Sequence, residues 1–193
     1  GALTALEFAH ELSEAGYYVF PCLDQRKFPS RVGNHESWGW FIDNSEQELL
    51  HANLLGSGNN TGAALCPRAE DPSRLLILDL DTYESSFDDV WHRLSPGESA
   101  PEGMGLVSTP SGGFHLWFSL PDEVNSDKLP ATIDMGGGLG GEIRASSKAR
   151  RLIMLPGSRV INKHGNSAKY KMVRKIVPSE LPPPPPTLLA RLT

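Results

Sequence analysis

Two carboxylates that close an apolar run are the first residues whose types and spacing could do chemistry. In LLILDLD, residues 75–81, four aliphatic residues lead into Asp79, and Asp81 follows two positions later. Side chains two apart on a strand point to the same face, so both carboxylates should project together. Their repulsion needs a positive partner, and a divalent metal ion is the obvious candidate. When no metal ion is bound, replacing either Asp with Asn should leave the melting temperature equal to or above that of the wild type. The alternative is a surface turn that closes a buried strand.

A second candidate segment is SGGFH, which runs from Ser111 to His115. Gly112 and Gly113 let the backbone come close to a ligand, Ser111 offers a hydroxyl group, and His115 projects from the strand that follows. This combination suits the oxygens of a phosphate group. An ordinary hairpin turn followed by a packed histidine would explain the same residues.

The third candidate segment opens a long stretch without acidic residues. Glu142 begins a strand-like segment, and Arg144 lies two residues on, on the same face, where a surface ion pair is the alternative. Between Arg144 and Pro178 there is no Asp or Glu, although the whole chain has a net charge of −5. Such an asymmetry favours an anionic ligand over a merely solvated surface. The stretch holds ten of the 18 basic residues: Arg144, Lys148, Arg150, Arg151, Arg159, Lys163, Lys169, Lys171, Arg174 and Lys175.

The composition bounds the kind of protein that must hold these residues. A chain of 193 residues with 39% hydrophobic residues can build the core of one domain, with room for a small appendage. It has no apolar stretch of the roughly 18 residues that a membrane span needs and no signal-peptide pattern, which predicts a soluble, cytoplasmic protein. Cys22 and Cys66 lie far apart without nearby Cys or His partners, so we expect buried thiols and no disulfide framework or zinc site.

The hydrophobic pattern predicts alternating helices and strands that would position the three segments. An amphipathic helix over 3–16 ends at Gly16, and a second helix over 45–55 begins at Ser45. A third helix, over 85–94, separates the strand that carries the two Asp residues from a hairpin over 104–120. Residues 24–40 are expected to form a long loop. The predicted strands outside the hairpin cover 17–22, 61–66, 74–81, 141–145, 150–157 and 168–174.

A domain boundary is predicted at Pro178, where the composition changes abruptly. The following stretch, SELPPPPPTLLARLT, holds five consecutive prolines, which continue neither a sheet nor a helix interior. Such a tract commonly acts as a semi-rigid spacer. We therefore expect residues 1–178 to form the catalytic domain and residues 179–193 to be a Pro-rich linker toward a further domain.

Taken together in this order, the three segments resemble the bifunctional primase-polymerase domain of the archaeo-eukaryotic primase superfamily. In that family an acidic pair ends one strand, a Ser-and-His motif follows on a hairpin, and a third acid opens a later strand. The stretches GYYVFPC, KFP, NNTGAAL and LPGS, with the later Gly165 and Tyr170, fit the same pattern. The resemblance spans residues 3–177. Two features depart from the pattern, because the third acid is Glu where Asp is frequent and the basic ASSKARR replaces a usually glycine-rich segment.

The resemblance implies a fold and an activity. The fold would be α/β (α+β) of the archaeo-eukaryotic primase type, with a central mixed sheet, an RRM-like catalytic part and a flanking N-terminal α/β subdomain. The activity would be template-directed nucleotidyl transfer, as DNA primase, DNA polymerase or both, in replication of a phage, plasmid or similar mobile element. Two Mg²⁺ or Mn²⁺ ions would be held by Asp79, Asp81 and Glu142. The partners would be nucleoside triphosphates, a single-stranded DNA template with its primer, and a helicase domain in the same chain.

The resemblance also divides the remaining candidates between two ligands. The residues that would hold the nucleotide are Ser111, Gly112, Gly113, His115, Arg144, Arg150 and Arg151. The residues that would follow the DNA backbone are Lys148, Arg159, Lys163, Lys169, Lys171 and Arg174.

Three other functions compete with this interpretation. The DLDT sequence is similar to the Asp-x-Asp-x-Thr of haloacid-dehalogenase phosphatases, but Tyr83 stands at the final position. A metal-dependent glycosyltransferase could use the Asp pair, yet it gives no reason for the acid-free basic stretch. A non-catalytic module that binds single-stranded nucleic acid would bind DNA without incorporating nucleotides, so a primer-extension assay separates it from a polymerase.

Overall fold

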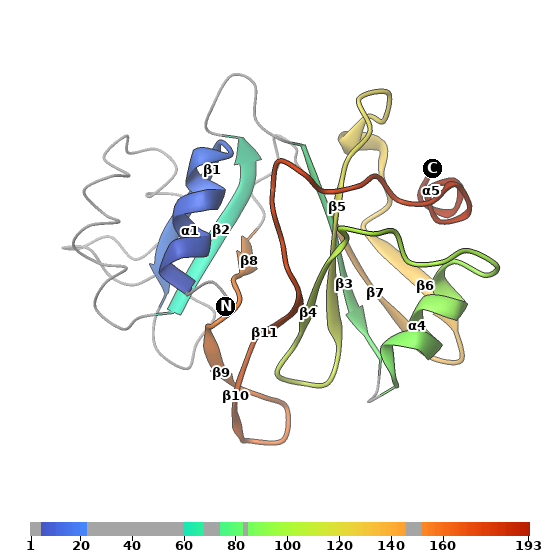
Figure 1. Ribbon diagram of the computed structural model, residues 1–193. Coiled ribbons are helices and arrows are strands. Elements are labelled where there is room, and N and C mark those ends of the chain that lie inside the picture. The colour runs from blue at the N-terminus through green and yellow to red at the C-terminus, as the bar shows by residue number, and fades with distance from the viewer. Residues whose placement is uncertain (1–4, 23–59, 68–73, 83–84, 146–151) are drawn as a thin grey trace. The chain divides into compact units, whose positions relative to one another are not determined.

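The computed structural model describes residues 5–22, 60–67, 74–82, 85–145 and 152–193 (Figure 1). The predicted loop over 24–40 and the predicted helix over 45–55 lie outside these ranges. The chain divides into two compact units, which are described separately. Unit 1 comprises residues 1–72 and 147–171, and unit 2 comprises residues 73–146 and 172–193. Among the described helices, none is long and apolar enough to cross a membrane.

Unit 1 combines one helix with a three-stranded antiparallel sheet. The helix α1 (Ala5–Glu14) buries Phe8, Ala9 and Leu12 and packs against the first two strands of this sheet. It is followed by Gly16, whose φ of 101° favours glycine, so the predicted amphipathic helix and its glycine stop are confirmed. The strands follow the order β1-β2-β8, and they are β1 (Tyr17–Cys22), β2 (Asn60–Pro67) and β8 (Leu152–Met154).

Of the two cysteines, Cys22 has a side chain that the structure describes. Cys22 is buried at the end of β1, and this burial raises its pKa to about 12. The thiol therefore stays protonated at neutral pH, and the prediction of a buried thiol is confirmed there. The side chain of Cys66 lies outside the described part of the structure.

Unit 1 also contains a short basic hairpin. Its strands are β9 (Arg159–Ile161) and β10 (Ser167–Lys169), which pair antiparallel and place Lys169 directly opposite Arg159. The turn is held by Asn162, whose side-chain oxygen accepts hydrogen bonds from the backbone N–H groups of His164 and Asn166. Two like charges face each other across this hairpin, an arrangement that an anionic ligand would relieve.

Unit 2 is built on a six-stranded antiparallel sheet in the order β11-β4-β5-β3-β7-β6. The strand that carries the two Asp residues is β3, and it lies between the hairpins β4-β5 and β6-β7 (Figure 1). The register of β3 is given on both sides, and both pairings are antiparallel. The strands are β3 (Leu75–Asp81), β4 (Gly105–Ser108), β5 (Phe114–Ser119), β6 (Thr132–Gly136), β7 (Leu139–Ala145) and β11 (Lys171–Arg174).

A large hydrophobic cluster of unit 2 lies on one face of this sheet. Leu76, Leu78 and Leu80 alternate along β3 and are fully buried in this cluster, as the period of two predicts. Two helices, α4 (Phe87–Leu94) and α5 (Pro186–Leu192), cover this face and add their apolar residues to the cluster (Figure 1). Asp79 and Asp81 belong to the opposite face, because they occupy the intervening positions of β3. Ile77 precedes them on that face and is fully buried, so the acids lie at the end of a buried apolar stretch.

The helix α5 is held on unit 2 by polar contacts as well as by its apolar residues. The backbone N–H of Thr187 donates to the Glu98 carboxylate, and the Arg191 guanidinium donates to the carbonyls of Arg93, Leu94 and Asp134. Desolvation opposes ionisation of Glu98, but hydrogen bonds from Ser95 and Thr187 outweigh it and lower its pKa from the ordinary value of a glutamate. The carboxylate is therefore ionised at neutral pH, as its role as acceptor requires.

The α+β class and the primase-like fold are confirmed, with differences in detail. The sheet of unit 2 is antiparallel where we expected a mixed sheet. Strands β6 and β9, the 3₁₀ helix η2 (Ser126–Lys128) and α5 were not predicted. In the stretch that we expected to act as a spacer, Leu181, Leu188 and Leu192 are buried. The boundary at Pro178 and a further domain beyond it stay predictions.

The burial of α5 can be tested by truncating one leucine. Leu188→Ala should lower the free energy of unfolding of unit 2 by about 2–5 kcal/mol, because the leucine is fully buried and its loss leaves a cavity. Val173→Ala is the control, since it truncates an aliphatic side chain of the same unit that is 58% exposed. Urea denaturation measures both variants, and equal stabilities would show that α5 does not belong to the folded unit.

Candidate active site

The register of three central strands brings the three candidate segments together. Asp79 on β3 lies directly opposite His115 on β5 and, on its other side, directly opposite Glu142 on β7. Directly paired residues project to the same face of a sheet. His115, Asp79 and Glu142 therefore form one row across the sheet, which we call the acid row. Asp81 lies on the same face, one step further along β3 and opposite Gly140.

The Asp79 carboxylate is contacted by positive or potentially positive groups from both neighbouring strands. His115 Nε2 lies 3.3 Å from Asp79 Oδ1, and Arg144 Nη2 lies 3.6 Å from Asp79 Oδ2. The same Arg144 nitrogen donates a hydrogen bond of 2.5 Å to Glu142 Oε2. One guanidinium nitrogen thus bridges the carboxylates of Asp79 and Glu142. The expected ion pair of Glu142 with Arg144 is present, and it extends to a third residue.

This bridge corrects our premise about charge repulsion. The sequence indicated that without a metal ion the acids would repel each other and that Asn at either position would not cost stability. In the structure Asp79 instead lies beside Arg144 and His115, with 29% of its side chain exposed. Opposite charges nearby favour the ionised carboxylate. The register could not be deduced from local sequence, which is why the partner of Asp79 was missed.

The donor set of the acid row suits a hard divalent cation. Carboxylate oxygens are the ligands that Mg²⁺ and Mn²⁺ prefer, and two of them already share one cationic nitrogen. In the present side-chain arrangement, no group of three His, Cys, Asp or Glu residues within the described ranges is close enough together to hold a metal ion. Asp81 is exposed and lies one step along β3 from the row. Binding at all three carboxylates would need side-chain rearrangement.

The glycine-rich segment forms the tight turn between β4 and β5, next to the end of β3. Thr82 donates a hydrogen bond of 2.8 Å to the Gly112 carbonyl, which fixes the turn beside Asp81. The backbone N–H groups of Gly112 and Gly113 are engaged with Thr109. A Cβ atom at Gly113 would collide with the carbonyl oxygen of Leu80. In this arrangement the glycines allow close packing of the turn, and their contact with a nucleotide stays a prediction.

Three residues of this site were not singled out from the sequence. Thr82 is buried and fixes the turn, and Gly141 lies so close to β3 that a Cβ atom there would collide with the Asp79 carbonyl oxygen. Gly140 approaches Ile133 of β6 in the same way. The signals were present as the Thr of DLDT and the two glycines before Glu142. They serve close backbone packing, which is invisible without the register.

His115 is buried beneath the charged face. Its side chain is 5% exposed, and its Nε2 faces the Asp79 carboxylate. The histidine is therefore packed, and its contact with a nucleotide stays a prediction. This position suits orientation of the Asp79 carboxylate better than direct contact with a bulky ligand.

The predicted DNA-binding residues fall in both units. Arg159, Lys163 and Lys169 lie on the hairpin of unit 1, whereas Arg174 stacks over the Phe87 ring of α4, 5.3 Å from its centroid. Phe87 packs against the hydrophobic cluster of unit 2, so Arg174 lies on the helix-covered side of the sheet. Lys171 begins β11 and is exposed. Lys148, Arg150 and Arg151 lie outside the described residues.

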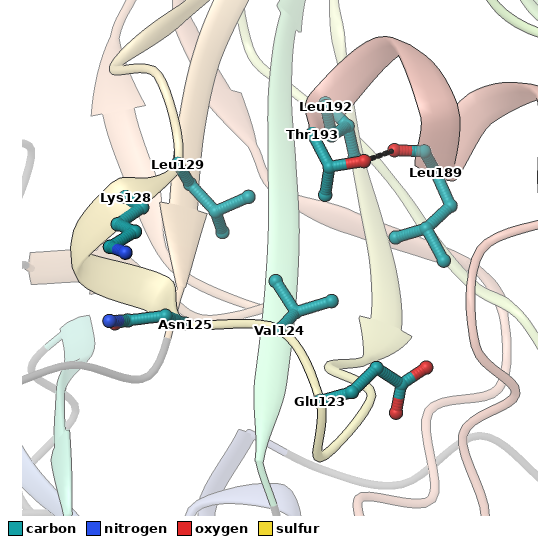
Figure 2. Close-up of a pocket in the computed structure, with 8 residues that line it drawn as sticks. All are labelled: Glu123, Val124, Asn125, Lys128, Leu129, Leu189, Leu192 and Thr193. Atoms are coloured by element: carbon teal, nitrogen blue, oxygen red, sulfur yellow. Dashed lines mark hydrogen bonds between the residues drawn. The ribbon is translucent and has the colours of Figure 1, made fainter.

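A pocket of about 460 Å³ lies away from the acid row (Figure 2). It opens between the segment around η2 and the helix α5, and two of its lining residues, Val124 and Leu192, belong to the core of the helix-covered face. The acid row lies on the opposite face, so this pocket is not its substrate site. The lining residues are Glu123, Val124, Asn125, Lys128, Leu129, Leu189, Leu192 and Thr193.

The packing of the turn against β3 predicts a strong effect of one methyl group. Gly113→Ala should lower the free energy of unfolding of unit 2 by about 1–3 kcal/mol, because the added carbon meets the Leu80 backbone, which cannot move without shifting β3. Gly97→Ala measures the different cost of a positive φ, because its added carbon has open space but its φ is +78°. A Gly113→Ala variant as stable as the wild type would contradict the close approach of the turn to β3.

Comparison with known protein families assigns most of the chain to one family. The family described as bifunctional DNA primase/polymerase, N-terminal (Prim-Pol) matches residues 9–184, a range that contains the acid row, the glycine-rich turn and the basic stretch. No curated protein matches the chain. Because the family match covers most of the sequence, the chain belongs to the Prim-Pol family of bifunctional DNA primases and polymerases, whose reaction class is nucleotidyl transfer.

Proposed function

We propose that the acid row is the catalytic centre of a template-directed DNA primase-polymerase that depends on divalent cations. The observation that carries this proposal is the register of β3, which places Asp79 between His115 and Glu142 with Asp81 beside them. Chemistry that joins a 3′-hydroxyl group to an α-phosphate needs clustered carboxylates on an accessible face. The family match favours this reaction over the phosphatase and glycosyltransferase alternatives.

The carboxylates of Asp79, Asp81 and Glu142 would hold Mg²⁺ or Mn²⁺. Such ions, when bound, stabilise the charge on the attacking and leaving oxygens. Asp79 and Glu142 would provide adjacent oxygens across the strand pair, and Asp81 would approach from the next position on β3. Glu is longer than Asp, which allows Glu142 to reach the same centre from the neighbouring strand.

The other residues of the face would position the reacting groups. His115 would hold the Asp79 carboxylate in place through Nε2. Ser111, at the tip of the turn beside the end of β3, would offer its hydroxyl to the triphosphate, with Gly112 and Gly113 shaping the turn. Arg144 carries the charge that the triphosphate needs on this face, and Arg150 and Arg151 would add to it.

The basic stretch would bind the template through its phosphates. The hairpin of unit 1 presents Lys163 and Lys169 on its exposed surface, and Arg159 lies opposite Lys169. Adjacent phosphates would relieve the repulsion of this cross-strand pair. Lys148 and Lys171 belong to the same proposed path, and Arg174 would join it only by leaving Phe87. Replication of a phage, plasmid or other mobile element, with a helicase in the same chain, is the context that this activity suggests.

Removing single carboxylates tests the catalytic proposal. Asp79→Asn, Asp81→Asn and Glu142→Gln should each reduce primer extension with Mn²⁺ by about two orders of magnitude or more, because an anionic ligand is lost at nearly unchanged shape. Affinity for single-stranded DNA should stay near that of the wild type. Asp79→Asn should also melt earlier than the wild type without divalent ions, since it loses the contacts of a carboxylate with Arg144 and His115. Full extension activity in the Asp variants would refute the proposal.

Salt dependence tests the template assignment separately. Binding of single-stranded DNA should weaken steeply with salt, and Lys163→Ala with Lys169→Ala should flatten the slope by about 0.7 per lost phosphate contact. Lys128→Ala removes an equally exposed charge from unit 2, outside the basic stretch, and should leave the slope unchanged. An unchanged slope in the double variant would remove the hairpin from the template path without affecting the catalytic assignment.

A further inference from the structure

Arg144 is positioned as a cation that belongs to the site itself. Its Nη2 lies 2.5 Å from Glu142 Oε2 and 3.6 Å from Asp79 Oδ2, and its side chain is 23% exposed. In the sheet register Arg144 lies opposite Ile77, and Ile77 lies opposite Trp117, both fully buried and apolar. Both carboxylates that Nη2 contacts belong to the acid row.

We propose that Arg144 is an internal counterion of the acid row that divalent cations displace, and that it then turns to the triphosphate. This inference rests on the proposed function. A divalent cation bound by Asp79 and Glu142 would coordinate the same carboxylate pair that Arg144 now contacts. Two cations so close repel each other in a partly buried site, where charge interactions are stronger than in water. Binding of the divalent ion therefore competes with the Arg144 bridge.

A bound divalent ion would occupy the carboxylate oxygens that the guanidinium now contacts on Asp79 and Glu142. A triphosphate brought to the same face offers oxygens in the fork geometry that guanidinium groups match. Nucleotide binding would thus hold Arg144 away from the carboxylates and favour binding of the divalent ion. By linkage, the divalent ion would favour binding of the nucleotide to the same degree.

The competition predicts opposite effects of one substitution on two ligands. Arg144→Gln should bind Mn²⁺ about three- to tenfold more tightly than the wild type when no nucleotide is present, because no internal cation has to leave. The same variant should have a raised KM for nucleoside triphosphates. A residue that merely supports the fold would weaken both ligands together. Lys128→Gln changes the net charge equally, far from the row, and should alter neither quantity.

Calorimetric titration of the metal-free protein with Mn²⁺ provides the test. Tighter binding by Arg144→Gln, together with a lower melting temperature before Mn²⁺ is added and a larger rise afterwards, would support the inference. Equal or weaker Mn²⁺ binding by the variant, with normal binding by the wild type, would overturn it and leave the proposed function intact. If Arg144→Gln fails to fold, Arg144→Lys replaces it in the test. Its ammonium group cannot bridge two carboxylates as a planar fork does, so the Mn²⁺ affinity should rise by less than expected for Arg144→Gln. Failure of the wild type to bind Mn²⁺ at all would refute the proposed catalytic centre as well.

Discussion

The closeness of two carboxylates on adjacent strands is the constraint on which the rest of the site depends. Asp79 and Glu142 are paired directly across β3 and β7, and such a pair of like charges destabilises a sheet unless a cation lies beside it. Arg144 supplies this cation by reaching back two positions along β7. Gly141 permits the approach of β7, because any side chain there would meet the Asp79 backbone. Where β3 pairs with β7, the carboxylates must therefore be neutralised and the two backbones must also approach closely.

The strand β3 can carry this charge because the face opposite the acids is packed against two helices. Its alternate leucines contribute to a core that α4 and α5 cover, so the position of the strand is fixed from the side away from the acids. The turn at Gly112 then fixes its end through Thr82. A strand that is rigidly held by one face can place charged groups on the other within a narrow range of positions. On the face of the acids, the buried Ile77 and Trp117 add packing next to the acid row.

The sequence predicted the strands whose pattern is local and missed the features that depend on long-range pairing. The apolar run of β3 and the hairpin around Gly112 were predicted correctly, because alternation and turn residues are local signals. Strand β6 was missed because it is short and runs into a glycine turn, and α5 was missed because the prolines before it suggested a spacer. The shared face of Glu142 and Arg144 followed from their spacing. The bridge to Asp79 did not, because only the register of β3 and β7 creates it.

The bridge by Arg144 lowers the stability cost of clustering carboxylates. A row of carboxylates that must receive divalent cations is least stable when those cations are absent, and natural proteins commonly accept such a cost at their active sites. Here a guanidinium on the neighbouring strand lowers that cost, since it neutralises the row without adding a separate structural element. Arginine suits this task better than lysine, because its planar fork can contact two carboxylates or two phosphate oxygens with the same group. Under the proposed function, the residue that stabilises the row without divalent ions already lies on the face to which the triphosphate would bind.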